Sequence, residues 1–154
     1  MILLIDSLEQ EKLEFPKVLG ITVATTRLEV GDYTAMHGEV RDSSVVERKS
    51  LADLFTSFAG NYEAEKDKLL KAKGMGLTYI LAIEVPFLEV LKGNTYWKDG
   101  ELHESKKSGL SQIRQLMTWQ RKYGVVVWFC QSRREMAMQI QEYFLAQERV
   151  REEA

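Results

Sequence analysis

"VVERKSLADLF" (residues 45–55) begins like a buried strand with two valines and then places Glu47, Arg48 and Lys49 directly behind them. Side chains two positions apart on a strand face the same side, so Glu47 and Lys49 project together while Arg48 points the other way. Burying unpaired charges is costly. We therefore expect these charges to be offset by one another, by a metal ion and by a polyanionic substrate instead of by partners in the core.

The rest of the chain alternates between two hydrophobic periods, which predicts an α/β order. Strands are expected over residues 1–6, 21–30, 43–49, 77–84 and 125–130, with a further strand beginning at Tyr33. Helical stretches are expected over residues 7–20, 61–74 and 108–123, after Ser50, and from Ser132 onward. The long polar segment 93–107 is expected to be a surface loop or a short hairpin across its "KDGE" turn.

The helix after the charged strand has clear local signals. Ser50 can cap it, and Asp53 lies favourably in its first turn. Its apolar residues, spaced for one buried face, are Leu51, Leu54, Phe55 and Phe58.

Composition limits the possible functions. The 154 residues are 45% hydrophobic, which is typical of one globular domain over residues 1–154. The net charge is -2, from 21 basic and 23 acidic residues, so a nucleic acid would have to meet a local basic patch. The single cysteine, Cys130, excludes a disulfide framework and a thiol-rich zinc site. We find no signal peptide and no membrane span, and expect a cytoplasmic protein.

A second carboxylate is available near Glu47. Asp32 follows the Gly31 turn, and a hairpin pairing Tyr33 with Val46 would bring Asp32 towards Glu47. Two carboxylates at one strand end suit a hard divalent cation such as Mg²⁺ or Mn²⁺. An adjacent lysine suits phosphoryl chemistry, because an ammonium can orient a water or stabilise developing charge.

The order of these motifs resembles a known family. "GDY" at residues 31–33, a loop, "VVERK" at residues 45–49 and then Asp53 follow the signature of the XPF-type structure-specific endonucleases. Asp6 matches the first acidic position of that family. The resemblance implies a restriction-endonuclease-like, PD-(D/E)xK α/β core with a central mixed β-sheet flanked by helices.

The resemblance also implies roles for individual residues. Asp32, Glu47 and the backbone carbonyl of Arg48 would ligate the metal, and Lys49 would position the attacking water. Asp6 would support the site directly or through a water. Arg48 and Asp53 would form an ion pair that fixes the turn from strand to helix.

The chain departs from the family pattern at two places. Leu8 stands where an arginine is usual, although Glu9 is kept. Asn61 and Glu65 flank Tyr62 where an arginine and a glutamine are usual. The tandem helix-hairpin-helix module that often follows such nuclease domains is not found in this sequence.

The function implied is that of an Mg²⁺- or Mn²⁺-dependent DNA endonuclease. Its expected substrates are branched, flap or junction DNA in recombination, repair or replication of a prokaryotic or viral genome. The alternative is a catalytically silent member that binds DNA or acts as a scaffold. A nucleotide-binding domain is disfavoured, since no glycine-rich phosphate loop follows the first strand.

Basic side chains would supply the phosphate contacts that DNA binding needs. The DNA-binding candidates are Lys66, Lys68, Lys71 and Lys73 after the site and Lys106 and Lys107 at the end of the long loop, with Arg114, Arg121 and Lys122 further on. Tyr96 and Trp97 could stack on an unpaired base or pack under their loop.

Two further features concern packing and partners. The terminal helix carries a stripe of Met136, Ile140, Tyr143 and Phe144, which could cover the sheet or form a homodimer interface. A partner protein that supplies specificity for DNA structure is a further expectation. His37 and His103 are expected to be exposed loop residues.

Overall fold

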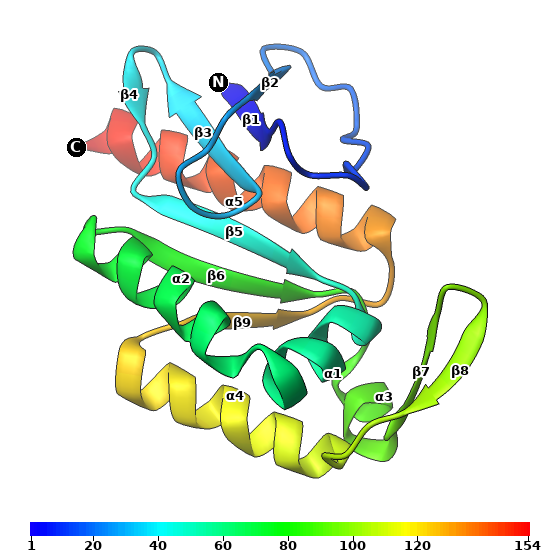
Figure 1. The fold of residues 1–154 in the computed structure, drawn as a ribbon. Helices are drawn as coiled ribbons and strands as arrows, with labels where there is room; N and C mark the ends of the chain where they lie inside the picture. Colours follow the sequence, from blue (N-terminus) through cyan, green and yellow to red (C-terminus); the bar gives the residue numbers. More distant parts are fainter.

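A mixed β-sheet forms the centre of the molecule, as predicted (Figure 1). The computed structural model describes the backbone of residues 1–154 and the side chains of residues 1–57 and 61–154. The strand order is β2-β1-β3-β5-β6-β9, and β4 pairs with β3. The strands are β1 (Ile2–Asp6), β2 (Thr22–Thr26), β3 (Tyr33–His37), β4 (Val40–Arg41), β5 (Ser44–Lys49), β6 (Thr78–Ile83) and β9 (Val126–Phe129).

The sheet is mixed: β3 is antiparallel to both of its main neighbours, β1 and β2 are parallel, and the strands from β5 onward are parallel. β3 runs antiparallel to β1 and β5, whereas β5, β6 and β9 are parallel to one another. The carboxyl ends of these three parallel strands therefore meet at one edge, and Lys49 lies at that edge on the central strand.

Helices cover both faces of the sheet (Figure 1). α1 (Leu51–Gly60), α2 (Tyr62–Gly74) and α4 (Gly109–Tyr123) contribute to the core on the face that holds Val45. α5 (Arg133–Glu153) covers the face that holds Val46. The two-residue alternation along β5 thus directs neighbouring valines into two separate cores.

A two-stranded hairpin stands out from this body beside α1 and α3 (Phe87–Lys92) (Figure 1). Its strands are β7 (Thr95–Lys98) and β8 (Glu101–Glu104), so the predicted hairpin across "KDGE" is confirmed. The turn residues Asp99 and Gly100 both have positive φ, at 51° and 76°, which is typical of the tight turn that matches strand twist.

Several local predictions are confirmed. Ser50 caps α1 by accepting a hydrogen bond from the Asp53 N–H, and the Asp53 carboxylate accepts one from the Ser50 N–H. Leu54 and Phe55 are buried on this helix, while the side chain of Phe58 lies outside the described residues. Cys130 is a buried free thiol whose pKa burial raises to about 11, which fits a small hydrophobic residue.

The prediction of a helix over residues 7–20 is wrong. This segment is irregular, because Pro16 interrupts it and its anchors are tertiary. Leu13 is buried, and its N–H donates to the Tyr33 hydroxyl at 3.0 Å. The strand predicted over residues 21–30 is shorter, since β2 ends at Thr26, and neither α3 nor β4 was predicted.

The apolar stripe of the terminal helix packs within the chain. Met136, Ile140 and Phe144 are fully buried in the core beneath the sheet. Tyr143 lies at their edge, with its hydroxyl 2.8 Å from the Ser44 hydroxyl. This stripe is therefore unavailable as the homodimer interface that it could have formed.

The two histidines also differ from expectation. The His37 side chain is only 5% exposed, and its Nε2 lies 2.8 Å from Asp42 Oδ2. His103 stacks on Tyr96 in the hairpin, with ring centroids 5.5 Å apart. The sequence showed only that both residues are polar and lie in polar segments. Their burial depends on tertiary contacts that the sequence does not show. Within the described part of the chain, no helix is both long and apolar enough to cross a bilayer.

Candidate active site

Asp32 is held beside β5 by the backbone. Tyr33 pairs with Val46, as the predicted hairpin requires, and the Asp32 N–H donates to the Val46 carbonyl at 2.8 Å. The Asp32 carbonyl accepts the N–H of Asp6, also at 2.8 Å. The Asp32 carboxylate then accepts the N–H of Arg48 at 2.8 Å. Three strands therefore fix the backbone and side chain of one acidic residue.

Gly31 makes this arrangement possible. Its φ is +77°, a conformation that other residues adopt only with strain, and a Cβ at this position would overlap the Val45 side chain. We expect Gly31→Ala to lower the free energy of unfolding by about 2–5 kcal/mol, from left-handed strain plus overpacking. Gly38→Ala is the matched control, because Gly38 has φ +65° but open space around its Cα. Urea unfolding would compare them, and equal losses in the two variants would contradict a steric role for Gly31.

Glu47 and Lys49 lie on the same face of β5, as predicted. Both residues are buried, and Lys49 Nζ is 3.6 Å from Glu47 Oε1. Glu65 of α2 approaches Lys49 more closely, at 2.9 Å. Lys68, one turn further along α2, bridges Glu47 at 3.2 Å and Glu65 at 3.3 Å. Two lysines and two glutamates therefore alternate in one ion-pair network.

Glu65 was not among the predicted site residues. Its sequence signal was present, because it replaces a polar residue of the family pattern and lies three positions before Lys68 on a helix. Sequence could not show that α2 places Glu65 over the end of β5. Its carboxylate neutralises Lys49, so the ammonium is held in a buried position without a substrate.

Arg48 corrects two predictions. Its guanidinium has partners in the core: Nε and Nη2 donate to the two carboxylate oxygens of Glu9, each at 3.0 Å. Nη1 donates to Glu84 at 2.6 Å. These acidic partners raise the pKa of Arg48 despite its burial. The expected ion pair with Asp53 is wrong, because Asp53 lies on α1 in the capping box.

Electrostatics distinguish Asp32 from these paired groups. Burial and the nearby Glu47 charge raise the pKa of Asp32 to about 8, against the opposing effect of the Arg48 N–H. Among the described side chains, no cation forms an ion pair with the Asp32 carboxylate. Asp32 therefore lacks a cation of its own, whereas Glu47 is paired with Lys49 and Lys68.

Asp6 lies next to this pair but has its own cation. Arg27 Nη1 donates to both Asp6 carboxylate oxygens at 2.9 Å, and the Leu28 N–H donates to Oδ1 at 3.0 Å. Burial opposes ionisation, but these hydrogen bonds and the Arg27 charge hold the pKa of Asp6 below its usual value. Asp6 thus supports Asp32 through its backbone N–H, while its carboxylate orients Arg27.

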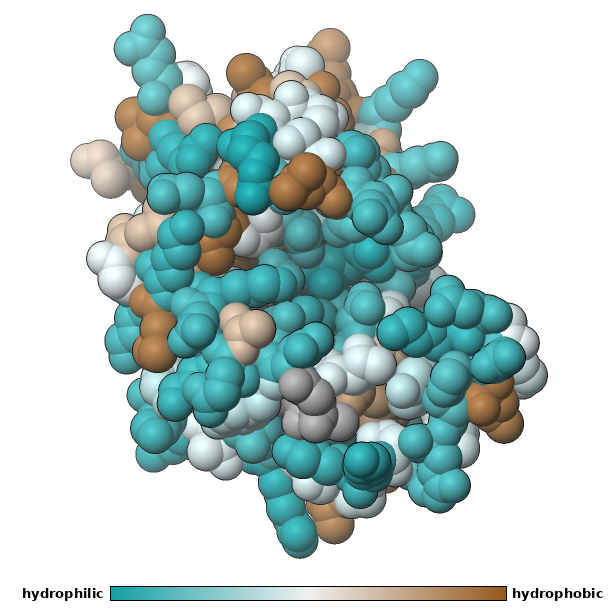
Figure 2. All heavy atoms as spheres, viewed as in Figure 1, coloured by the Kyte–Doolittle hydropathy of each residue, from teal (hydrophilic) through white to brown (hydrophobic). Residues whose placement is uncertain are grey.

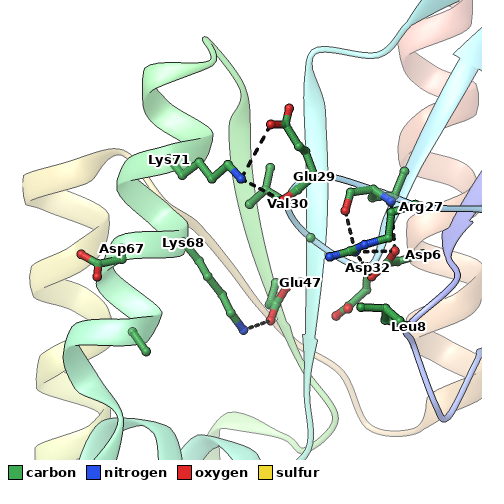
Figure 3. Close-up of a pocket in the computed structure, with 13 residues that line it drawn as sticks. Asp6, Leu8, Arg27, Glu29, Val30, Asp32, Glu47, Asp67, Lys68 and Lys71 are labelled. Carbon is green, nitrogen blue, oxygen red and sulfur yellow. Dashed lines mark hydrogen bonds and ion pairs between the residues drawn. The ribbon is translucent and has the colours of Figure 1, made fainter.

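Two cavities meet at Asp32 and Glu47. The first, of about 430 Å³, is bordered by exposed cations from α2 and by Arg27, which directly follows β2 (Figure 3). Figure 3 shows Lys68 directed at Glu47, and Arg27 at Asp6. The second, of about 820 Å³, lies between residues 8–11 and the β7–β8 hairpin. Figure 2 shows that hydrophilic residues dominate the hollowed face between the hairpin and the body.

The predicted DNA-binding lysines are divided by the structure. Lys68 and Lys71 border the first cavity, and Lys71 also lies 3.7 Å from Glu29. Four other candidates border neither cavity: Lys66, Lys73, Lys106 and Lys107. Arg27 was missed, although its place after a strand parallel to β1 puts it at the same sheet edge as Asp6.

The donor set fits a hard divalent cation. Asp32 and Glu47 offer carboxylate oxygens in a partly buried place, where burial and the nearby Glu47 charge raise the pKa of Asp32. In the described residues, no three His, Cys, Asp or Glu side chains converge as a ligand cage. A cation bound by two carboxylates and completed by water and phosphate oxygens is the arrangement that Mg²⁺ favours.

A family model described as the ERCC4 domain matches residues 5–143. The chain belongs to the ERCC4 domain family. XPF from Aeropyrum pernix has 20% identity and a TM-score of 0.63 to this ERCC4 domain, over 92% of this chain and 62% of that one. The same protein in complex with DNA has 21% identity and a TM-score of 0.63, with the same coverage. Comparison with curated proteins found no significant match.

These matches confirm the predicted restriction-endonuclease-like fold. The chain spans 62% of the length of the XPF structures that it matches.

Proposed function

We propose that this ERCC4 domain is a metal-dependent DNA endonuclease. The observation that carries the proposal is the end of β5, where Asp32, which has no ion-pair partner among the described side chains, and Glu47 lie beside the Lys49 ammonium, 3.6 Å from Glu47. Two adjacent carboxylates, one of them without a cation, next to a fixed lysine suit phosphodiester hydrolysis more than a purely structural role.

Each residue would have a distinct task. Asp32, Glu47 and the Arg48 carbonyl would hold Mg²⁺ or Mn²⁺, which when bound polarises a phosphate and activates a water. Lys49 would orient that water or stabilise charge that develops on the phosphate. Glu65 keeps Lys49 in place before DNA arrives, at a distance of 2.9 Å.

The first cavity would receive the phosphate backbone. Arg27, Lys68 and Lys71 are all exposed there, against the exposed acids Glu29 and Asp67. Positive charge at this side of the site would supply salt-dependent affinity without sequence preference. Lys66, Lys73, Lys106 and Lys107 would then contact only more distant parts of a DNA substrate.

The proposal also covers the substrate, the pathway and the location of the protein. The protein would cleave branched, flap or junction DNA during recombination, repair or replication, and it would act in the cytoplasm. A homodimer, or a partner protein that supplies specificity for DNA structure, would complete the assembly. The A. pernix XPF solved with DNA supports DNA as the ligand class.

Cleavage of end-labelled single-stranded, duplex, flap and four-way-junction DNA with Mg²⁺ or Mn²⁺ tests the proposal. We expect Lys49→Ala to slow cleavage by about a hundredfold or more, because the ammonium acts where charge develops. Lys66→Ala is the matched control, since this lysine is on α2 but outside both cavities, and it should cut at nearly the native rate. Binding without cleavage in either metal would instead favour the catalytically silent scaffold.

A further inference from the structure

The second cavity differs chemically from the first. Its exposed charged side chains are mostly acidic, with Glu11, Asp53 and Asp99 against Lys98. Arg48 and Lys49 also border it, but both are buried and engaged by glutamates. Negative charge at this side disfavours a phosphate backbone, so a nucleic acid strand that crosses the site would present its bases here.

Apolar side chains stand on both walls of this cavity. Leu8 on one wall is 65% exposed, and Trp97 on the hairpin is 69% exposed. Leu8 also borders the first cavity, so it lies where the two cavities join. An indole ring is the side chain best suited to stack on a nucleobase, and such stacking is indifferent to sequence.

The hairpin is built to hold Trp97 in place. A two-stranded hairpin is marginal in water, but this one is anchored by Tyr96, which stacks on Phe55 of α1 at 5.7 Å and on His103 at 5.5 Å. Trp97 follows Tyr96 and pairs across the strands with Leu102, which is 57% exposed. Of the two aromatic residues, Tyr96 therefore serves as the anchor and Trp97 remains accessible.

We propose that the cleft between residues 8–11 and the β7–β8 hairpin binds an unpaired nucleotide of single-stranded DNA, with the base stacked on Trp97. This inference rests on the proposed endonuclease function and deepens it. The phosphates lie towards Arg27, Lys68 and Lys71, and the base lies on the opposite side of Asp32 and Glu47. The site thereby selects DNA with a single-stranded segment next to the cut over continuous duplex.

Binding measured without cleavage tests this placement. Labelled oligothymidylate and a matched duplex would be titrated in the presence of a chelator with the native chain, Trp97→Ala, Trp97→Phe and Leu88→Ala. We expect Trp97→Ala to weaken single-strand binding by about tenfold, while Trp97→Phe keeps most of the affinity. Duplex binding should not change. Leu88→Ala is the matched control, because Leu88 is 57% exposed on α3 and borders neither cavity, and it should bind like the native chain.

Fluorescence gives a second readout. Of the three tryptophans, Trp119 is buried and Trp128 is partly buried, so Trp97 is the solvent-exposed fluorophore. Oligothymidylate should quench the native emission, and Trp97→Phe should lose that quenching. Native-like single-strand binding by Trp97→Ala, or equal losses for single strand and duplex, would overturn the inference. Conversion of a native dimer to a monomer by Trp97→Ala would also overturn it, because the hairpin would then bind a second copy.

The cleavage assay separates this inference from the function beneath it. If the native chain and Trp97→Ala cut single-stranded and duplex DNA with the same preference, the stacking role fails while the nuclease stands. If no DNA is cut but single-strand binding depends on Trp97, the cleft assignment stands while the nuclease fails.

Discussion

Asp32→Asn should abolish metal-dependent cleavage and at the same time stabilise the metal-free protein at alkaline pH. Loss of a carboxylate that would hold the cation should slow cleavage by about a hundredfold to a thousandfold. The asparagine keeps an oxygen that can accept the Arg48 N–H, so the local hydrogen bond to this strand is retained. The variant therefore removes charge without removing shape.

The stability effect follows from the sign of the pKa shift. Burial and Glu47 raise the pKa of Asp32 from 3.8 to about 8, so the folded chain retains a proton that the unfolded chain has released. The contribution of this group to stability is fully present below its unfolded pKa and is lost as pH rises through about 8. Asparagine mimics the protonated carboxyl group and does not ionise, so it avoids that loss.

Thermal unfolding without metal would measure the difference. At about pH 9 the Tm of Asp32→Asn should exceed that of the native chain by roughly 2–4 °C or more, and this difference should shrink steadily as the pH is lowered to about 4, where the two should be close. Added Mg²⁺ should raise the Tm of the native chain more than that of the variant. Equal stabilisation of both by Mg²⁺, or near-native cleavage by the variant, would contradict the assignment of Asp32.

Arg48→Met should be the most destabilising change near the site. The Arg48 guanidinium lies within 3.0 Å of both Glu9 and Glu84, and methionine removes this partner from both carboxylates. Removing one member of a buried ion-pair network costs about 3–5 kcal/mol, since the remaining charges stay in a place of low dielectric. Arg48 links the irregular segment after β1, the end of β5 and the residue after β6, so its loss affects three parts of the fold.

Arg133→Ala is the matched control for this prediction. Arg133 also donates to Glu84, at 2.8 Å, but its side chain is 42% exposed and water can replace it. We expect Arg133→Ala to lower the free energy of unfolding by about 1 kcal/mol or less. Urea unfolding would compare both variants with the native chain. A loss in Arg48→Met no larger than that in Arg133→Ala would show that Arg48 is not the structural centre of this network.

The predicted elements succeeded where one period governed a whole segment. The alternation along residues 45–49 placed Glu47 and Lys49 on one face of β5 and Arg48 on the other. The two faces of this strand border different cores. The Ser50 cap was correctly predicted because it depends only on residues within one turn. Segment 7–20 failed because its buried Leu13 is anchored to Tyr33, a contact that no local period reveals.

The sequence by itself determined most of the strands and helices, the turn at Gly31 and the acidic and basic residues at the end of β5, because these depend on steric and periodic rules between near neighbours. Only the tertiary structure decided which charges meet. Glu9 and Glu84 reach Arg48, Glu65 reaches Lys49, and Arg27 reaches Asp6. Apart from Lys49 and Glu65, these partners lie far apart in the chain, and ion-pair formation depends on distance in space, which the packing of helices on the sheet sets.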